Sequence, residues 1–127
     1  MWQPIFEENG LKLDENWSDY DKLVEKLGDE GIANAIATSD PLHEAETYDE
    51  ITKRGTEAMD KVITDAKKAK AKNVMIVSSG SMIPTLLELV VPDEYNGEMM
   101  DNCSVTILTY KDDKYSVKVI GDTQYIE

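Results

Sequence analysis

The stretch Asn73–Thr85 reads NVMIVSSGSMIPT, and it decides most of the fold that the sequence predicts. The apolar run Val74–Ser78 indicates a strand buried on both faces by helices, as in a parallel or mixed sheet. A turn of serine and glycine follows, and the pattern of Met82–Val90 predicts a helix whose first turn tolerates Pro84. A strand that leads through a tight turn into a helix is a common way to hold a phosphate group.

The turn between this strand and this helix is the candidate site. Gly80 allows a tight turn of the backbone, and the amides around it would point from the start of the helix toward an anion. The serine hydroxyls would add further donors. We therefore predict that Ser79, Gly80 and Ser81 bind phosphate. The alternative is a plain strand-to-helix turn in which a serine caps the helix.

No catalytic nucleophile can be assigned from these residues. The order SSGS at positions 78–81 lacks the two glycines of the G-x-S-x-G elbow. His43 is the one histidine, and it is expected to lie exposed in a polar loop rather than beside Ser79. Cys103 is expected to be buried and inert, since it adjoins a strand pattern. We expect no catalytic residue, no metal and no cofactor.

Helical patterns fill most of the chain before this stretch. The segments Ser18–Gly28 and Glu30–Thr38 are typical of short amphipathic helices. The segment Thr47–Lys72 gives the strongest signal, because Thr47 and Glu50 have the spacing of a capping box. Lysines gather in the last turns of this helix, where they suit the negative end of its dipole.

Two alternating segments near the C-terminus predict a β-hairpin. They are Val105–Tyr110 and Tyr115–Ile120, and the letters KDDK separate them. With the strand at 74–78 the prediction is about three strands and four helices. The expected fold class is α/β, built in layers, and 127 residues fit a single domain.

The composition narrows the classes of partner. A formal net charge of −13 disfavours nucleic acid and acidic membrane surfaces, because both would repel the chain. The sequence shows no apolar window that approaches a membrane span and no signal-peptide pattern at its start. One cysteine cannot form an internal disulfide, so nothing indicates an oxidising compartment. We expect a cytoplasmic protein.

Four short motifs occur in a recognisable order. A helix opening of the form G-E-S/T is present as AET at 45–47, and Arg54 follows the glutamate by eight residues. A strand end of the form V-S-H-G is present as VSSG at 77–80. The patterns N-A-S-V-T-V-L and G-D-T-S-Y-L are present as NCSVTIL at 102–108 and GDTQYI at 121–126. Residues 45–126 thus resemble the C-terminal half of the histidine phosphatase superfamily, also called phosphoglycerate mutase-like.

The resemblance implies a three-layer fold and a phosphohistidine mechanism, for which this sequence lacks the central residues. The family's nucleophile lies in an R-H-G motif that does not occur here, and Ser79 stands where the family has a second histidine. Arg54 is expected to be structural. Residues 1–44 resemble a helical insertion that some bacterial members carry. We expect a truncated member, a pseudoenzyme that by itself lacks the family's phosphomonoester hydrolase or phosphomutase activity.

Two other functions stay open at this stage. The chain could be a non-enzymatic module that binds phosphate or a phosphosugar, or an acidic interaction domain. The resemblance also implies that the strand at 74–78 would have an open apolar edge without the family's N-terminal half. Such an edge favours self-association or pairing with a separately made N-terminal half.

Overall fold

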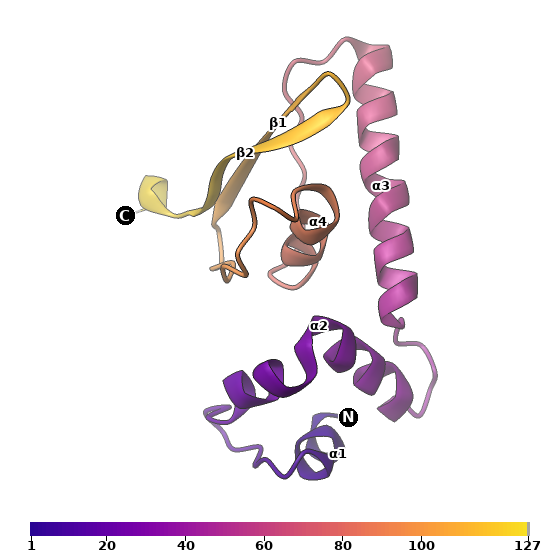
Figure 1. Cartoon of the computed structure of the whole chain (residues 1–127), viewed down its shortest axis with the longest axis vertical. Coiled ribbons are helices and arrows are strands. Elements are labelled where there is room, and N and C mark those ends of the chain that lie inside the picture. Colours follow the sequence, from indigo (N-terminus) through magenta and orange to yellow (C-terminus); the bar gives the residue numbers. More distant parts are fainter. Residues whose placement is uncertain (127) are drawn as a thin grey trace. The chain divides into compact units, whose positions relative to one another are not determined.

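The structure is a computed structural model that describes residues 1–126 (Figure 1). The chain divides into two compact units, Met1–Lys53 and Arg54–Glu127, and each is described here by itself. Within the described residues, four α-helices and one two-stranded sheet confirm a mixed α/β fold class. That the chain is a single domain, with an insertion-like part at 1–44, stays a prediction.

The first unit is built around two helices, α1 (Trp2–Glu8) and α2 (Tyr20–Ser39). Its core consists of Ile5 and Phe6 from α1 and Leu23 from α2. The sequence patterns predicted two helices in the place of α2, and the structure explains why. Gly28 has φ 65° and ψ 176°, so α2 is kinked at the residue expected to end the first helix.

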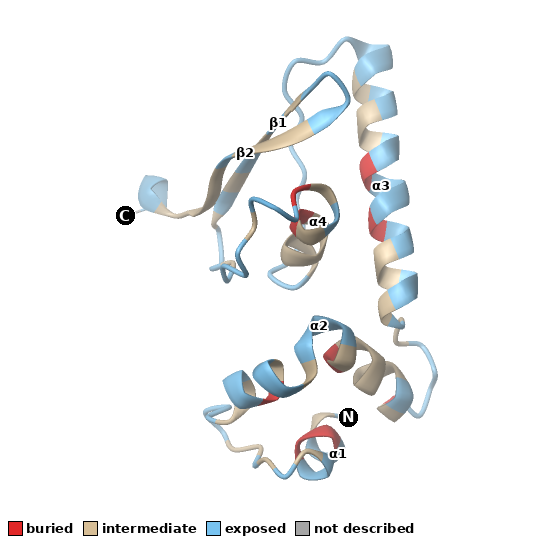
Figure 2. Ribbon diagram, viewed as in Figure 1, coloured by how far each residue is buried: buried red, intermediate tan, exposed pale blue. Residues whose placement is uncertain are grey.

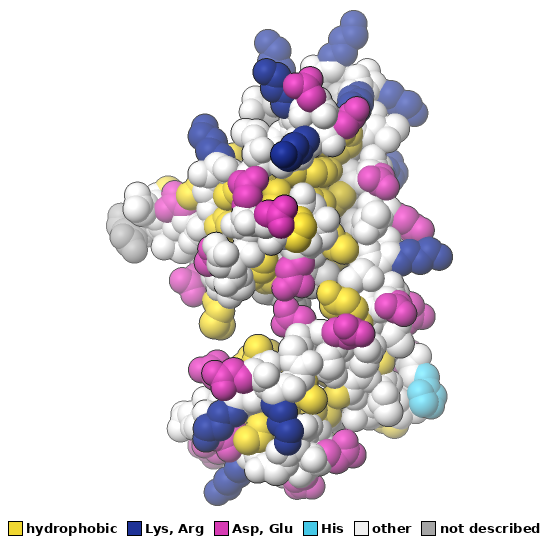
Figure 3. Space-filling view, viewed as in Figure 1, with side chains coloured by type: hydrophobic (Ala, Val, Ile, Leu, Met, Phe, Trp, Pro, Cys, Tyr) yellow, Lys and Arg dark blue, Asp and Glu magenta, His cyan; other side chains and the backbone are white. Residues whose placement is uncertain are grey.

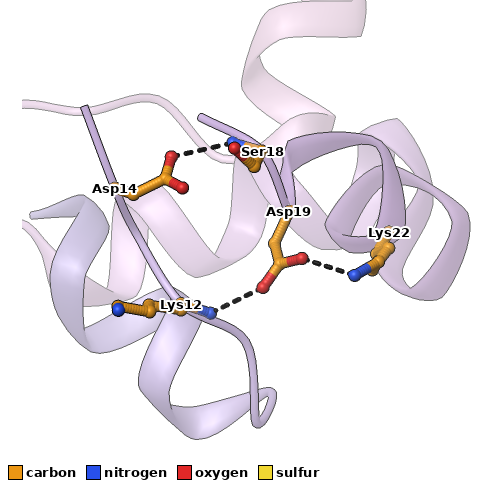
Figure 4. Close-up of polar contacts among 5 residues, drawn as sticks. All are labelled: Lys12, Asp14, Ser18, Asp19 and Lys22. Carbon is orange, nitrogen blue, oxygen red and sulfur yellow. Dashed lines mark hydrogen bonds and ion pairs between the residues drawn. The ribbon is translucent and has the colours of Figure 1, made fainter. Parts of the chain in front are cut away.

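The loop that joins α1 to α2 is ordered by hydrogen bonds to two aspartate carboxylates (Figure 4). Asp14 accepts hydrogen bonds from the amides of Ser18 and Asn16, which lower the pKa of its carboxyl group. Asp19 accepts from the Lys22 ammonium at 2.6 Å and from the Lys12 amide at 3.0 Å, and these contacts lower its pKa. Each of these acidic residues therefore orders its own loop or a helix start.

Helix α3 (Tyr48–Ala69) begins at the predicted capping box. The Thr47 amide donates to Glu50 Oε2 at 2.8 Å, and the Glu50 amide donates to Thr47 Oγ1 at 3.3 Å. These bonds satisfy amides that have no partner inside a helix, and they lower the pKa of Glu50. The helix ends three residues earlier than predicted, because Lys70 has φ 52°.

In the second unit, α3 packs against α4 (Met82–Val90), which has the predicted bounds. The contact is close at Gly55, where a Cβ atom would lie 3.0 Å from Met82 Cε and 3.1 Å from Leu86 Cδ2. Met59 of α3 and Leu87 of α4 are buried. The core of this unit therefore lies between the two helices (Figure 2).

The predicted hairpin is confirmed as strands β1 (Val105–Lys111) and β2 (Lys114–Asp122), which pair antiparallel. The hairpin turn contacts the end of α3, where Lys67 Nζ lies 3.1 Å from Asp113 Oδ1. This ion pair raises the pKa of Lys67, which also lies over the ring of Tyr110. A short 3-10 helix, Gln124–Ile126, follows β2.

The predicted strand Val74–Ser78 is wrong for the described residues. This segment belongs to no sheet, and residues 71–81 are all exposed, as the pale connection between α3 and α4 shows (Figure 2). Its side chains are those of a buried strand, but no other segment of residues 1–126 pairs with it. A strand forms only beside another strand, and that partner cannot be read from local sequence.

Candidate phosphate-binding turn

The turn at 79–81 connects the extended segment to α4, and all three residues are exposed. The Met82 amide donates to Ser79 Oγ at 3.2 Å, and Ser79 Oγ lies 3.2 Å from Ser81 Oγ. The Ile83 amide donates to the Ser79 carbonyl at 3.0 Å. Ser79 is thus the residue whose side chain caps the start of α4, while Ser81 makes no such bond.

These bonds change what the turn can offer to a ligand. The first amides of a helix attract anions because they have no partner within the helix. The Met82 amide already donates to Ser79 Oγ, so it is not available to an anion. The amides of Gly80 and Ser81 make no hydrogen bond among the described residues, and one of the two serine hydroxyls donates to the other, so two amides and one hydroxyl remain as neutral donors.

Gly80 is favoured by a close approach of another loop rather than by an unusual backbone angle. A Cβ atom at Gly80 would lie 3.3 Å from the carbonyl oxygen of Met100. Its φ is not among the positive values found at Gly97 and Gly121. The loop at 99–100 therefore closes over the turn, and a larger residue at position 80 would push that loop away.

The turn carries no charge of its own, since no residue from 73 to 85 is acidic or basic. Lysines of the second unit gather instead around the end of α3 and the hairpin turn, where dark blue side chains cluster in Figure 3. Within the described residues, no base is bonded to Ser79, whose hydroxyl contacts Ser81 and Met82. The turn can therefore hold an anion through neutral donors, but its serines are not activated for attack.

The other candidate residues lie elsewhere. His43 is in the first unit, exposed in the turn after α2, as the sequence predicted. Its amide donates to the Asp40 carbonyl at 3.2 Å. Arg54 is an exposed residue of α3. Cys103 was expected to be buried, but it is exposed, because it lies in the turn before β1 with φ 63°.

Asp40 is a buried carboxylate that sequence reasoning missed. It accepts hydrogen bonds from the amides of Leu42 at 3.0 Å, Ala45 at 2.8 Å and Glu44 at 2.7 Å. These bonds hold its pKa below the ordinary value. Asp40 is the residue that follows the last turn of α2, and its carboxylate orders the loop that leads to α3.

Comparison with known proteins decides the family. A sequence model of the histidine phosphatase superfamily (branch 1) matches residues 11–123. The chain belongs to this superfamily. The predicted resemblance is therefore confirmed at the level of the superfamily.

A solved structure agrees with this assignment. The chain is similar to the crystal structure of phosphoglycerate mutase from Bacillus anthracis str. Sterne, with 26% sequence identity and a TM-score of 0.78. The match covers 98% of this chain and 52% of that chain, so the chain spans about half the length of the protein that it matches. A search of curated protein sequences finds no match. No helix in the described residues is both long and apolar enough to cross a membrane.

Proposed function

We propose that residues 1–127 carry the phosphate-facing turn of a histidine phosphatase-like fold and do not hydrolyse phosphomonoesters by themselves. The observation that carries this proposal is at Ser79. The resemblance places a phosphate-binding histidine at this position, and the hydroxyl found there accepts the Met82 amide as a helix cap. A capping hydroxyl stabilises α4, but it can neither form a phosphohistidine nor carry positive charge.

The charge of the turn supports the same conclusion. Phosphoryl transfer depends on positive charge placed around the oxygens of the transferred group. The stretch 73–85 supplies none, and the sequence contains one arginine and no R-H-G motif. Losing a covalent nucleophile removes the route through a phosphoenzyme. The polypeptide is therefore a pseudoenzyme when it is tested alone.

Weak binding of phosphate or a phosphosugar is the second candidate function. It is favoured by the amides of Gly80 and Ser81, which make no hydrogen bond among the described residues at the start of α4. Because the donors are neutral, we expect weak affinity that depends little on salt. An interaction domain that only uses the acidic surface would show no response to phosphate.

The test combines an activity assay with a binding assay on the 127-residue chain. We expect no release of phosphate from p-nitrophenyl phosphate, and a titration with inorganic phosphate should shift the amide resonances of Gly80 and Ser81. Ser79→Ala should alter these shifts, whereas Ser78→Ala is the matched control, because Ser78 is exposed and makes no hydrogen bond among the described residues. Turnover that Ser79→Ala abolishes would contradict the proposal of inactivity, and unmoved resonances would exclude phosphate binding.

A further inference from the structure

Two asparagine–glycine pairs occur in the chain, one at Asn9 and Gly10 and the other at Asn96 and Gly97. Asparagine is a thermolabile residue, because the amide nitrogen that follows it can attack its side-chain carbonyl carbon. Glycine at the next position favours this attack, since it has no Cβ atom to crowd its own amide nitrogen. The attack also requires that neither reacting group is held in a hydrogen bond. The two pairs differ in this respect.

The pair at the end of α1 is held by hydrogen bonds at both reacting groups. Asn9 Nδ2 donates to the Ile5 carbonyl at 2.8 Å, and the Gly10 amide donates to the Glu7 carbonyl at 3.0 Å. Lys26 Nζ donates to the Asn9 carbonyl at 2.9 Å and so fixes the peptide group between the two residues. A reaction at Asn9 would therefore require the end of α1 to open first.

The pair in the loop after α4 has neither restraint. Asn96 and Gly97 are both exposed, and Gly97 has φ 81°. Across the part of the chain that the structure describes, the Asn96 side chain and the Gly97 amide make no hydrogen bond. The bonds of this loop involve other groups, since the Asn96 amide donates to Glu98 Oε2 at 2.9 Å and the Tyr95 hydroxyl donates to the Glu98 carbonyl at 2.7 Å. A Cβ atom on Gly97 would meet nothing within 4 Å, so the reacting groups also have room to approach each other.

We propose that Asn96 is a site of self-modification, at which the side-chain amide is converted to isoaspartate and aspartate through a cyclic imide with Gly97. The Gly97 amide nitrogen loses its proton to solvent and attacks Asn96 Cγ. The new N–Cγ bond closes the ring, the Cγ–Nδ2 bond breaks, and ammonia leaves after taking up a proton from solvent. Water then adds to one of the two ring carbonyls and opens the ring. Nothing is oxidised or reduced, and water is the one co-reactant.

The product would alter the loop that closes over the turn at 79–81. Isoaspartate adds one carbon to the backbone and one negative charge two residues from Glu98, whose carboxylate accepts the Asn96 amide. The same loop carries the Met100 carbonyl oxygen, which lies 3.3 Å from the place of a Cβ atom on Gly80. We expect conversion at Asn96 to displace this contact and to shift the amide resonance of Gly80. The inference does not rest on phosphate binding, because the conversion is measured without a ligand.

The experiment incubates the 127-residue chain in a warm, mildly alkaline buffer and maps its peptides by mass spectrometry. Both pairs are followed in the same sample through the mass gain of an amide that becomes an acid. In the folded chain, conversion at Asn96 should be at least roughly 10-fold faster than at Asn9, because Asn9 reacts only from a locally opened state. In urea the two rates should agree within a few-fold. An isoaspartyl methyltransferase should label the converted peptide that contains Asn96.

Asn96→Gln is the matched control, since it keeps an exposed side-chain amide but would have to close a larger and less favourable ring. It should stay unmodified over the same period, and its Gly80 resonance should not move. Equal rates at Asn9 and Asn96 in the folded chain would overturn the proposal, as would a rate at Asn96 that rises on unfolding as much as the rate at Asn9. Aspartate without isoaspartate would exclude the cyclic imide. Conversion that leaves the Gly80 resonance in place would overturn the proposed effect on the turn.

Discussion

Replacing Leu87 by alanine should destabilise the second unit far more than the same replacement two residues further along α4. Leu87 is 2% exposed and lies in the core with Met59, whereas Leu89 is 37% exposed. The two substitutions remove the same atoms from the same helix, so their effects on helix propensity are equal. The difference between their free energies of unfolding therefore measures the effect of side-chain burial.

The exposures set the expected magnitudes. Removing a fully buried leucine side chain loses its transfer free energy and leaves a cavity, which together cost about 2–5 kcal/mol. The substitution Leu89→Ala removes a side chain that is only partly buried and leaves a depression open to solvent. It should therefore cost about 1–1.5 kcal/mol. The difference is a large share of the stability of a small domain, which is typically about 5–15 kcal/mol.

Urea unfolding followed by circular dichroism at 222 nm measures both free energies, because α3 and α4 contribute to that signal. We expect Leu87→Ala to lower the midpoint clearly, with Leu89→Ala lying between it and the wild type. Equal costs, or a larger cost at Leu89, would refute the burial of Leu87 in the core of the second unit.

Three further predictions concern the connections between helices. The lowered pKa of Asp40 means that its carboxylate adds stability above its ordinary pKa, and that this stability is lost as pH falls through the folded-state value. Urea unfolding from about pH 5 to pH 2 should show this loss, and Asp40→Asn should make the slope shallower without abolishing it, because Asp14, Asp19 and Glu50 also have lowered pKa values. Gly28→Ala should cost about 1–3 kcal/mol, because φ 65° with ψ 176° is open only to glycine; thermal unfolding of the first unit, followed by tryptophan fluorescence, measures this. Thr47→Ala should cost about 1 kcal/mol in the same urea assay by removing the cap of α3, whereas the mid-helix control Thr64→Ala should cost nothing.

Elements with local causes were predicted well from the sequence. The capping box at Thr47 and Glu50 depends on two residues three apart, and it forms as expected. The hairpin depends on alternation around a short turn, and α4 on its apolar spacing, so both appear close to their predicted bounds. The family could be recognised for a similar reason, because its motifs are short and keep their order.

Elements that depend on distant partners were predicted poorly. Helix α1 has no strong helical pattern, and it is stabilised by the packing of Ile5 and Phe6 against Leu23. Cys103 lies beside a strand pattern, yet it has a positive φ in the turn before β1 and is exposed. The local sequence pattern predicts neither the packing of α1 against Leu23 nor the turn at Cys103.

The stretch 73–85 separates what the sequence by itself determined from what the tertiary structure decided. Its residue order determined an extended apolar run, a serine–glycine turn and a helix, because each depends on neighbours a few positions away. The tertiary structure decided that Ser79 caps α4 and that the apolar run stays outside any sheet. The physical reason is that a strand is stabilised by hydrogen bonds to another backbone, and residues 1–126 provide none for this segment.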